Sequence, residues 1–332
     1  MSKGKGEIVP SVRIQSEKDS LCCRYSNNKQ FIVAGHTDGV VKVYESMTGK
    51  PVNKMSREDV KDEVPVTSVH FKPQPGKGET TNILTTYTDG KVILWNYETG
   101  KKIKQIEEKR QTLGATYHPK LSKFLTLGDD SAIYLYDEET MRLEHTYEKG
   151  MVSSVVDGHS SRVFAAIFHP LQQTEFVSGG WDSVVHFWDL RQPNSLRYIK
   201  GVHMCGEGLD ISRNGRELMT CSYVRENALQ LWHYQTGRLL ANVEPDPYKS
   251  MLYCGQWMTN ETMLIGGTDP NLLRIVSLKT LSTMMSYRGS SSGVYSADHC
   301  FKSGRQSKKD ASVDLKIVFA IDKSLIECEV TL

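Results

Sequence analysis

Residues 158–189 read GHSSRVFAAIFHPLQQTEFVSGGWDSVVHFWD, and this stretch decides the fold. Apolar and polar residues alternate from Val163 to Phe168, and two further apolar runs end at Gly180 and at Asp189. Short runs of this kind, separated by Gly, Ser and Asp, are typical of strands joined by tight turns. The stretch therefore predicts three consecutive short strands.

The same pattern recurs along the chain, marked by an acid in one turn and a closing residue at the end of the next strand. The seven pairs are Asp38/Tyr44, Asp89/Trp95, Asp130/Tyr136, Asp182/Trp188, Glu226/Trp232, Asp269/Val276 and Asp322/Cys328. Six pairs are six residues apart, and successive acids lie 41 to 53 residues apart. A period of about 40–45 residues is typical of repeat folds, and the longer steps imply loop insertions. The chain is therefore predicted to hold seven units.

The Gly158-His159 start and the Trp188-Asp189 end of the quoted stretch resemble the signature of a WD-repeat, the unit of a β-propeller. The resemblance to the WD-repeat β-propeller superfamily covers nearly all of the chain and is strongest in the fourth unit. It implies an all-β fold, a seven-bladed β-propeller of four-stranded antiparallel blades. The expected blades are residues 21–55, 66–106, 113–147, 158–199, 206–243, 251–287 and 294–330.

The seventh unit has room for only three strands, while Ile8–Ile14 reads as a strand with no partner of its own. Closing the ring would remove the open end at which blades expose their apolar faces. We therefore expect strand 8–14 to complete the last blade, so that residues 8–332 form a single propeller. Residues 1–7 are expected to form a disordered tail.

Blade four contains His159, Ser178 and Asp182, which are the residue types of a nucleophilic triad. Ser178 is expected inside a strand, and the residues around it, FVSGG, do not form the GxSxG turn that would expose its hydroxyl. The resemblance to WD-repeats implies a different role, in which these side chains and Trp188 form a buried hydrogen-bonded network. The network would tie the loop before the blade to its inner strands. We therefore predict a structural role for these four residues and no catalytic residue.

Composition argues against several classes of protein. Lys and Arg total 41 and Asp and Glu total 39, so the net charge of +2 gives no reason to expect a polyanionic ligand. The seven Cys form no CxxC pair, which favours reduced thiols over disulfides or a metal site. No apolar run approaches the roughly 20 residues of a transmembrane helix, and MSKGKGE is not a signal peptide. We expect a cytoplasmic or nuclear protein with no metal, no cofactor and no membrane span.

The residues just before the turn acids are expected at the mouth of the central channel, on the face that carries these acids, here called the Asp-turn face. Trp181 stands out, because an exposed Trp is unusual unless something covers it; packing against an adjacent loop is the alternative. Arg162, Arg225 and Asp129 are expected on the same face, and Trp and Arg are enriched at interface hot spots. We predict a non-enzymatic scaffold or adaptor that binds a peptide or protein segment there. We expect no small-molecule substrate, and membership of a multisubunit complex is left open.

Two other functions are weighed against this one. The basic stretch 302–309 could bind nucleic acid or a phosphoinositide, but nucleic acid is not the favoured ligand because a solvated loop has the same composition. Its cations are Lys302, Arg305, Lys308 and Lys309. An enzyme that used the central channel would need several His or acidic residues converging from the inner strands, which are predicted to be apolar.

Overall fold

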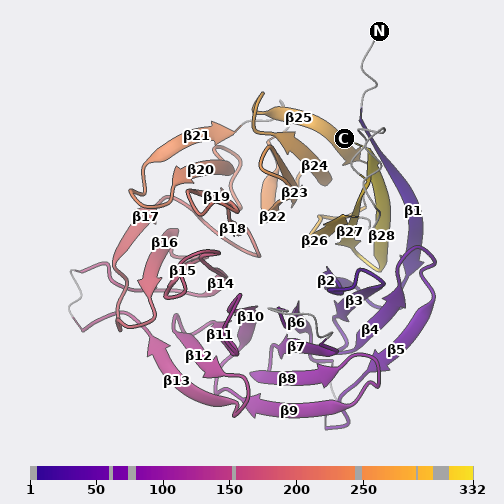
Figure 1. Ribbon diagram of the computed structural model, residues 1–332, viewed down its shortest axis with the longest axis horizontal. Coiled ribbons are helices and arrows are strands. Elements are labelled where there is room, and N and C mark those ends of the chain that lie inside the picture. The colour runs from indigo at the N-terminus through magenta and orange to yellow at the C-terminus, as the bar shows by residue number, and fades with distance from the viewer. Residues whose placement is uncertain are drawn as a thin grey trace.

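The strands of the computed structural model form seven four-stranded antiparallel sheets, arranged as blades around a central axis (Figure 1). The structure describes residues 6–59, 63–73, 80–151, 155–243, 249–288, 291–301 and 314–331. The seven-bladed all-β propeller predicted from the repeat is confirmed. In the described part of the chain, no helix is long and apolar enough to cross a bilayer.

The first four blades follow one another in the chain, each starting at the channel and ending at the rim. Blade one consists of β2 (Ser20–Tyr25), β3 (Phe31–His36), β4 (Val41–Glu45) and β5 (Pro51–Met55). Blade two consists of β6 (Val66–Phe71), β7 (Asn82–Tyr87), β8 (Lys91–Asn96) and β9 (Lys102–Glu107). Blade three consists of β10 (Thr112–Tyr117), β11 (Lys123–Gly128), β12 (Ile133–Asp137) and β13 (Arg142–Tyr147). Blade four consists of β14 (Val163–Phe168), β15 (Glu175–Gly180), β16 (Val184–Asp189) and β17 (Arg197–Lys200).

The last three blades repeat this order, except that the seventh takes its outer strand from the start of the chain. Blade five consists of β18 (Leu209–Ile211), β19 (Glu217–Cys221), β20 (Leu229–His233) and β21 (Leu239–Val243). Blade six consists of β22 (Met251–Trp257), β23 (Thr262–Thr268), β24 (Leu272–Ser277) and β25 (Ser282–Arg288). Blade seven consists of β26 (Ser296–Phe301), β27 (Asp314–Ile321), β28 (Ser324–Thr331) and β1 (Glu7–Gln15).

The hydrophobic core lies between the blades rather than inside any one of them. Each cluster of buried side chains draws on two neighbours, as where Leu125 and Leu135 of blade three meet Phe168 and Trp188 of blade four. Because both faces of a blade are covered, its middle strands are buried on both sides. In β15 every residue after Glu175 is buried, which explains why this strand reads as a continuous apolar run.

The ring is closed by pairing between the two ends of the chain. β1 pairs antiparallel with β28, with Val9 opposite Glu329 and Ile14 opposite Leu325 (Figure 1). Pro10 sits at a shift in this register, and β1 is an outer strand, where a residue without an N–H is tolerated. The predicted closure by the N-terminal strand is therefore confirmed.

Two expectations fall on residues that are described only in part or not at all. Residues 1–5 of the expected tail lie outside the described residues, whereas Glu7 already belongs to β1. The basic stretch 302–309 also lies outside the described residues.

Candidate functional site

The four residues of the expected network in blade four lie within hydrogen-bonding distance of one another. The indole N–H of Trp188 donates to Ser178 Oγ at 2.8 Å, and the Ser178 hydroxyl donates to His159 Nε2 at 2.7 Å. The opposite ring nitrogen, Nδ1 of His159, donates to Asp182 Oδ2 at 2.8 Å. His159, Ser178 and Trp188 are buried. The chain of bonds therefore joins the loop before β14 to β15, to the following turn and to β16.

Asp182 remains ionised within this network. Burial raises the pKa of its carboxyl, but the hydrogen bond from His159 acts in the opposite direction. The backbone N–H groups of Ser160 and Val184 also donate to the carboxylate, at 3.0 Å and 3.2 Å. Together these donors hold the pKa of Asp182 below its ordinary value. The carboxylate thus fixes the tautomer of His159, because it can only accept a hydrogen bond.

The geometry of this network is unsuited to nucleophilic or metal chemistry. Ser178 lies within β15 and is fully buried, so no substrate can reach its hydroxyl. The ligand-type atoms of His159, Asp182 and His186 lie within 4.8 Å of one another. Both nitrogens of His159 are already bonded, whereas His186 bonds to Ser195 Oγ through Nδ1 at 2.8 Å and its buried Nε2 has no hydrogen-bond partner among the described residues. A metal ion could bind here only by breaking the bonds that tie the blade together.

Other blades bind the turn acid from the same preceding loop but with different donors. Arg57 donates to Asp89 at 2.7 Å in blade two, and Arg110 donates to Asp130 at 2.7 Å in blade three. Sequence reasoning missed both ties because Arg stands in place of His. A usable signal was available, since each Arg falls in the loop before its blade, as His159 does.

Trp181, the strongest candidate for partner binding, is held on the Asp-turn face and remains 41% exposed. The Arg162 guanidinium lies 4.8 Å from the centre of its ring, and the centre of the Phe164 ring lies 5.5 Å away. Its indole N–H points to Cys205 Sγ at 3.2 Å. The side chain therefore packs on neighbouring loops, and a large part of the ring still faces water.

The other two candidate residues make separate contacts. Arg225 forms an ion pair with Asp269 of blade six, and both side chains are more than half exposed. Asp129 accepts a hydrogen bond from the backbone N–H of Gln111 at 3.0 Å. The structure thus brings Trp181 and Arg162 together, whereas Arg225 pairs with the neighbouring blade six and Asp129 with the loop before its own blade.

Trp181 belongs to a larger set of rings that spans blades four to seven. The His203 ring stacks on that of Trp181, with 6.3 Å between the ring centres. The Tyr253 ring lies between those of Tyr223 and Tyr295, with 4.9 Å between ring centres in each case. The two halves meet where the N–H of Tyr223 donates to the carbonyl of His203 at 2.7 Å. We call this set the aromatic arc: Phe164, Trp181, His203, Tyr223, Tyr253 and Tyr295.

The aromatic arc was missed because two of its members occupy β-bulges. The inner strands β14 and β22 each contain one extra residue, Phe164 and Tyr253, where the pairing register shifts. A bulge re-aims a side chain that regular alternation would direct elsewhere. The signal in the sequence was an aromatic residue directly after a buried residue at or next to the start of an inner strand, Val163 or Leu252.

The central channel contains a cavity of about 240 Å³, and its lining corrects one sequence expectation. The inner strands were expected to be apolar, yet Arg24, His70 and His299 all face this cavity. Each of these residues is only half-buried and lies on a strand with several buried residues, β2, β6 or β26, so the polar positions that face the channel were overlooked among the apolar ones. Glu207 and Asp210 contribute carboxyl groups from blade five and the loop before it.

Three of these residues span the channel. Arg24 of blade one forms an ion pair with Glu207, and His70 Nε2 of blade two lies 3.1 Å from the same carboxylate. Burial, reinforced by the charge of Arg24, lowers the pKa of His70 to about 3. His70 is therefore neutral at pH 7 and donates an N–H to Glu207. The network links the loop before blade five to blades one and two on the far side of the ring.

Asp210 also lines the cavity, and its pKa is raised, whereas that of His70 is lowered. Burial raises the pKa of its carboxyl to about 7, although the backbone N–H groups of Trp257 and Ile211 lower it in part. These donors lie 2.7 Å and 2.8 Å from the two carboxyl oxygens. Asp210 is thus a carboxyl group of the channel that changes charge near neutral pH.

Replacing His159 with Ala leaves the Ser178 hydroxyl without its acceptor and removes the side-chain donor of Asp182. Each buried polar group that loses its partner costs about 1–3 kcal/mol, so we expect a clear loss of free energy of unfolding, measured by urea denaturation. The control is His233→Ala, whose ring, among the residues that the structure describes, accepts hydrogen bonds from Thr236 of its own turn. The control should change stability by no more than about 0.5 kcal/mol. Equal effects of the two variants would contradict a structural role for the network.

The contribution of Asp210 to stability should depend on pH with a defined sign. Its pKa is about 7 in the folded protein against 3.8 ordinarily, so the folded state holds a proton that the unfolded chain has lost. The stabilisation is complete below the lower pKa and disappears as the pH rises through the higher one. We therefore expect the free energy of unfolding of the wild type, minus that of Asp210→Asn, to fall between these values and then stay constant. A difference that stays constant over this range would show that the carboxyl is already ionised in the folded protein and would contradict the raised pKa.

Comparison with known proteins agrees with this architecture. The family model described as WD domain, G-beta repeat matches residues 11–45 and 150–189. Periodic tryptophan protein 2 of Arabidopsis thaliana is 26% identical over 176 residues, which is 52% of this chain and 17% of that protein. The Striatin homolog of Dictyostelium discoideum is 20% identical over 60% of this chain and 25% of its own length. Cilia- and flagella-associated protein 52 of Chlamydomonas reinhardtii is 24% identical over 50% of this chain and 25% of its own length.

The matches thus span a quarter or less of each of these relatives. The second matched segment contains the blade-four stretch with its His159 network, and the first runs from β1 to the end of β4. Together with the ring of seven four-stranded blades, these two matches confirm the resemblance of this chain to WD-repeat β-propellers.

Proposed function

We propose that this chain is a non-enzymatic scaffold or adaptor that binds a protein or peptide segment on its Asp-turn face. The observation that carries the proposal is the aromatic arc, because it places several rings side by side at the mouth of the channel. Trp181 is 41% exposed and Tyr295 is 37% exposed. A partner that covered these rings would bury apolar area and would satisfy their polar edges.

The charges around the arc favour a segment of mixed composition. Arg162 presents a cation above Trp181, while the exposed Arg225–Asp269 pair offers both signs in blades five and six. Charged groups at the edge of an interface contribute more to the rate and specificity of binding than to its affinity. The rings would therefore supply most of the affinity, and the rim would select the partner.

A non-enzymatic role is supported by the condition of the candidate chemical groups. Ser178 and His159 are buried and bonded to each other, and the Glu207 carboxylate is paired with Arg24. A cytoplasmic or nuclear location is also part of the proposal. The seven cysteines are all free, and six of them are buried, which suits a reducing compartment.

Trp181→Ala tests the proposed surface directly. We expect the variant to fold, to keep the melting temperature of the wild type to within a few degrees, and to lose the partners that the wild type retains in affinity purification. For an isolated partner segment, loss of a hot-spot ring should raise the Kd roughly thirtyfold, or about 2 kcal/mol.

The matched control is Leu171→Ala. Leu171 is also exposed, but it lies between β14 and β15, at the opposite face of the same blade. This variant should retain every partner. Retention of all partners by a folded Trp181→Ala/Arg225→Ala double variant would remove the Asp-turn face as the binding surface.

A further inference from the structure

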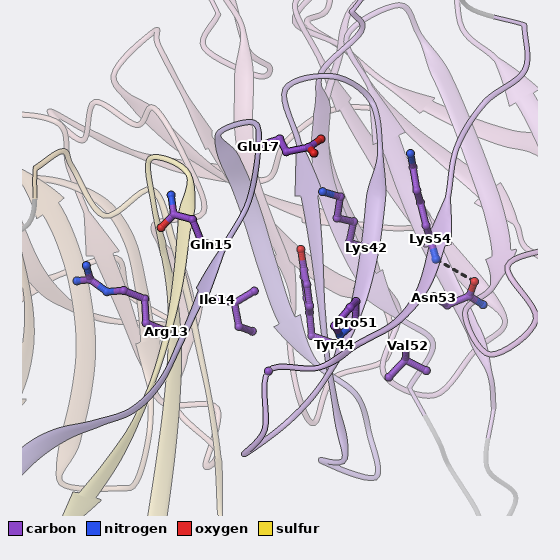
Figure 2. Close-up of a pocket in the computed structure, with 11 residues that line it drawn as sticks. Arg13, Ile14, Gln15, Glu17, Lys42, Tyr44, Pro51, Val52, Asn53 and Lys54 are labelled. Carbon is purple, nitrogen blue, oxygen red and sulfur yellow. Dashed lines mark hydrogen bonds between the residues drawn. The ribbon is translucent and has the colours of Figure 1, made fainter.

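A groove of about 650 Å³ lies at the seam where the ring is closed, between β1 of blade seven and β4 and β5 of blade one. We call it the seam groove. Ile14 and Tyr44 are buried at its base, and Val52, which is 51% exposed, forms part of its outer wall (Figure 2). A hydrogen bond of 3.1 Å between Ser16 Oγ and the Tyr44 hydroxyl joins its two sides. The groove thus has an apolar base, with polar and charged side chains around it.

The charged residues of the seam groove are predominantly cations. Arg13, Lys42 and Lys54 line it, against the single carboxylate of Glu17. Figure 2 shows Lys42 and Lys54 extending in the same direction, toward the end of the groove where Glu17 lies. Among the residues that the structure describes, no hydrogen bond or ion pair engages the ammonium group of Lys42 or Lys54.

The two lysines are directly opposite each other on neighbouring strands. Lys42 of β4 is the register partner of Lys54 of β5. Like charges in this position repel and destabilise the sheet. The arrangement therefore costs the free protein stability, and among the described residues no carboxylate forms an ion pair with either ammonium group.

The repeat provides six internal controls for this position. The corresponding pairs in blades two to seven are Ile93/Gln105, Tyr134/Thr146, His186/Tyr198, Gln230/Asn242, Arg274/Ser286 and Ile326/Arg13. None of these pairs joins two lysine or arginine residues. The doubled cation is thus not required by the blade architecture, and it occurs in the blade that borders the seam groove.

We propose that the seam groove is a docking site for an acidic segment of a partner protein. Carboxylates of the segment would neutralise Lys42 and Lys54, and apolar residues between them would contact Val52 and the base of the groove. The two ammonium groups are compact point charges, which suit separate carboxylates along an extended chain. This site lies on the rim of the propeller, so it does not depend on the aromatic arc or on the function proposed for the Asp-turn face.

The proposal is tested with a fluorescein-labelled peptide in which glutamate alternates with leucine and serine, titrated with the full-length chain. We expect saturable binding that weakens as salt is added, because exposed charges are screened. Lys42→Glu/Lys54→Glu should weaken binding roughly tenfold or more. Lys101→Glu/Lys102→Glu makes the same change in net charge on the rim of blade two and should leave binding unchanged. A peptide with lysine in place of glutamate should not bind.

The melting temperature of the free protein separates a binding role from a structural one. Lys54→Glu places opposite charges across β4 and β5, so it should raise the melting temperature while weakening binding of the acidic peptide. The proposal is overturned if the wild type shows no saturable binding, or if the blade-two control loses binding equally. It is also overturned if only phosphoinositide vesicles or RNA bind in a Lys42- and Lys54-dependent way, or if the charge reversal abolishes self-association instead.

Discussion

The pairing of β1 with β28 is the constraint on which the rest of this structure depends. Each blade buries its two faces only against its neighbours, so an open row of seven would expose apolar surface at both ends. The residue pairs from Glu7/Thr331 to Gln15/Ser324 close that row with main-chain hydrogen bonds and bring Ile14 into the core with Leu325. The closed ring then fixes the geometry of the channel, the Asp-turn face and the seam groove.

Within the closed ring, corresponding positions carry different chemistry in different blades. The loop before a blade holds the turn acid with His159 in blade four, but with Arg57 in blade two and Arg110 in blade three. These substitutions keep the tie while the side chains vary. Other positions on this face do not hold a turn acid, and in blades four to seven several of them carry the rings of the aromatic arc. The repeat therefore separates what maintains the fold from what can recognise a partner.

The sequence was sufficient for features that depend on local pattern. Period-two alternation located the strands, and the recurring acids counted the blades. The hydrogen-bonded network at His159 was predicted because the fourth unit matches the WD-repeat signature closely. Contacts between distant blades were beyond reach, because no local pattern relates Arg24 to Glu207 across the channel. The bulges that re-aim Phe164 and Tyr253 also break the alternation on which the prediction relied.

Amide hydrogen exchange of β1 tests the central claim most directly, because it reports whether this strand is held in the sheet under native conditions. If the strand closes the ring, its amides that bond to β28 will be protected to the same degree as those of β27 in the same blade. The protection should be lost only when the whole propeller unfolds. Exchange of the β1 amides at the rate of a free peptide, while β26 to β28 remain protected, would contradict the account.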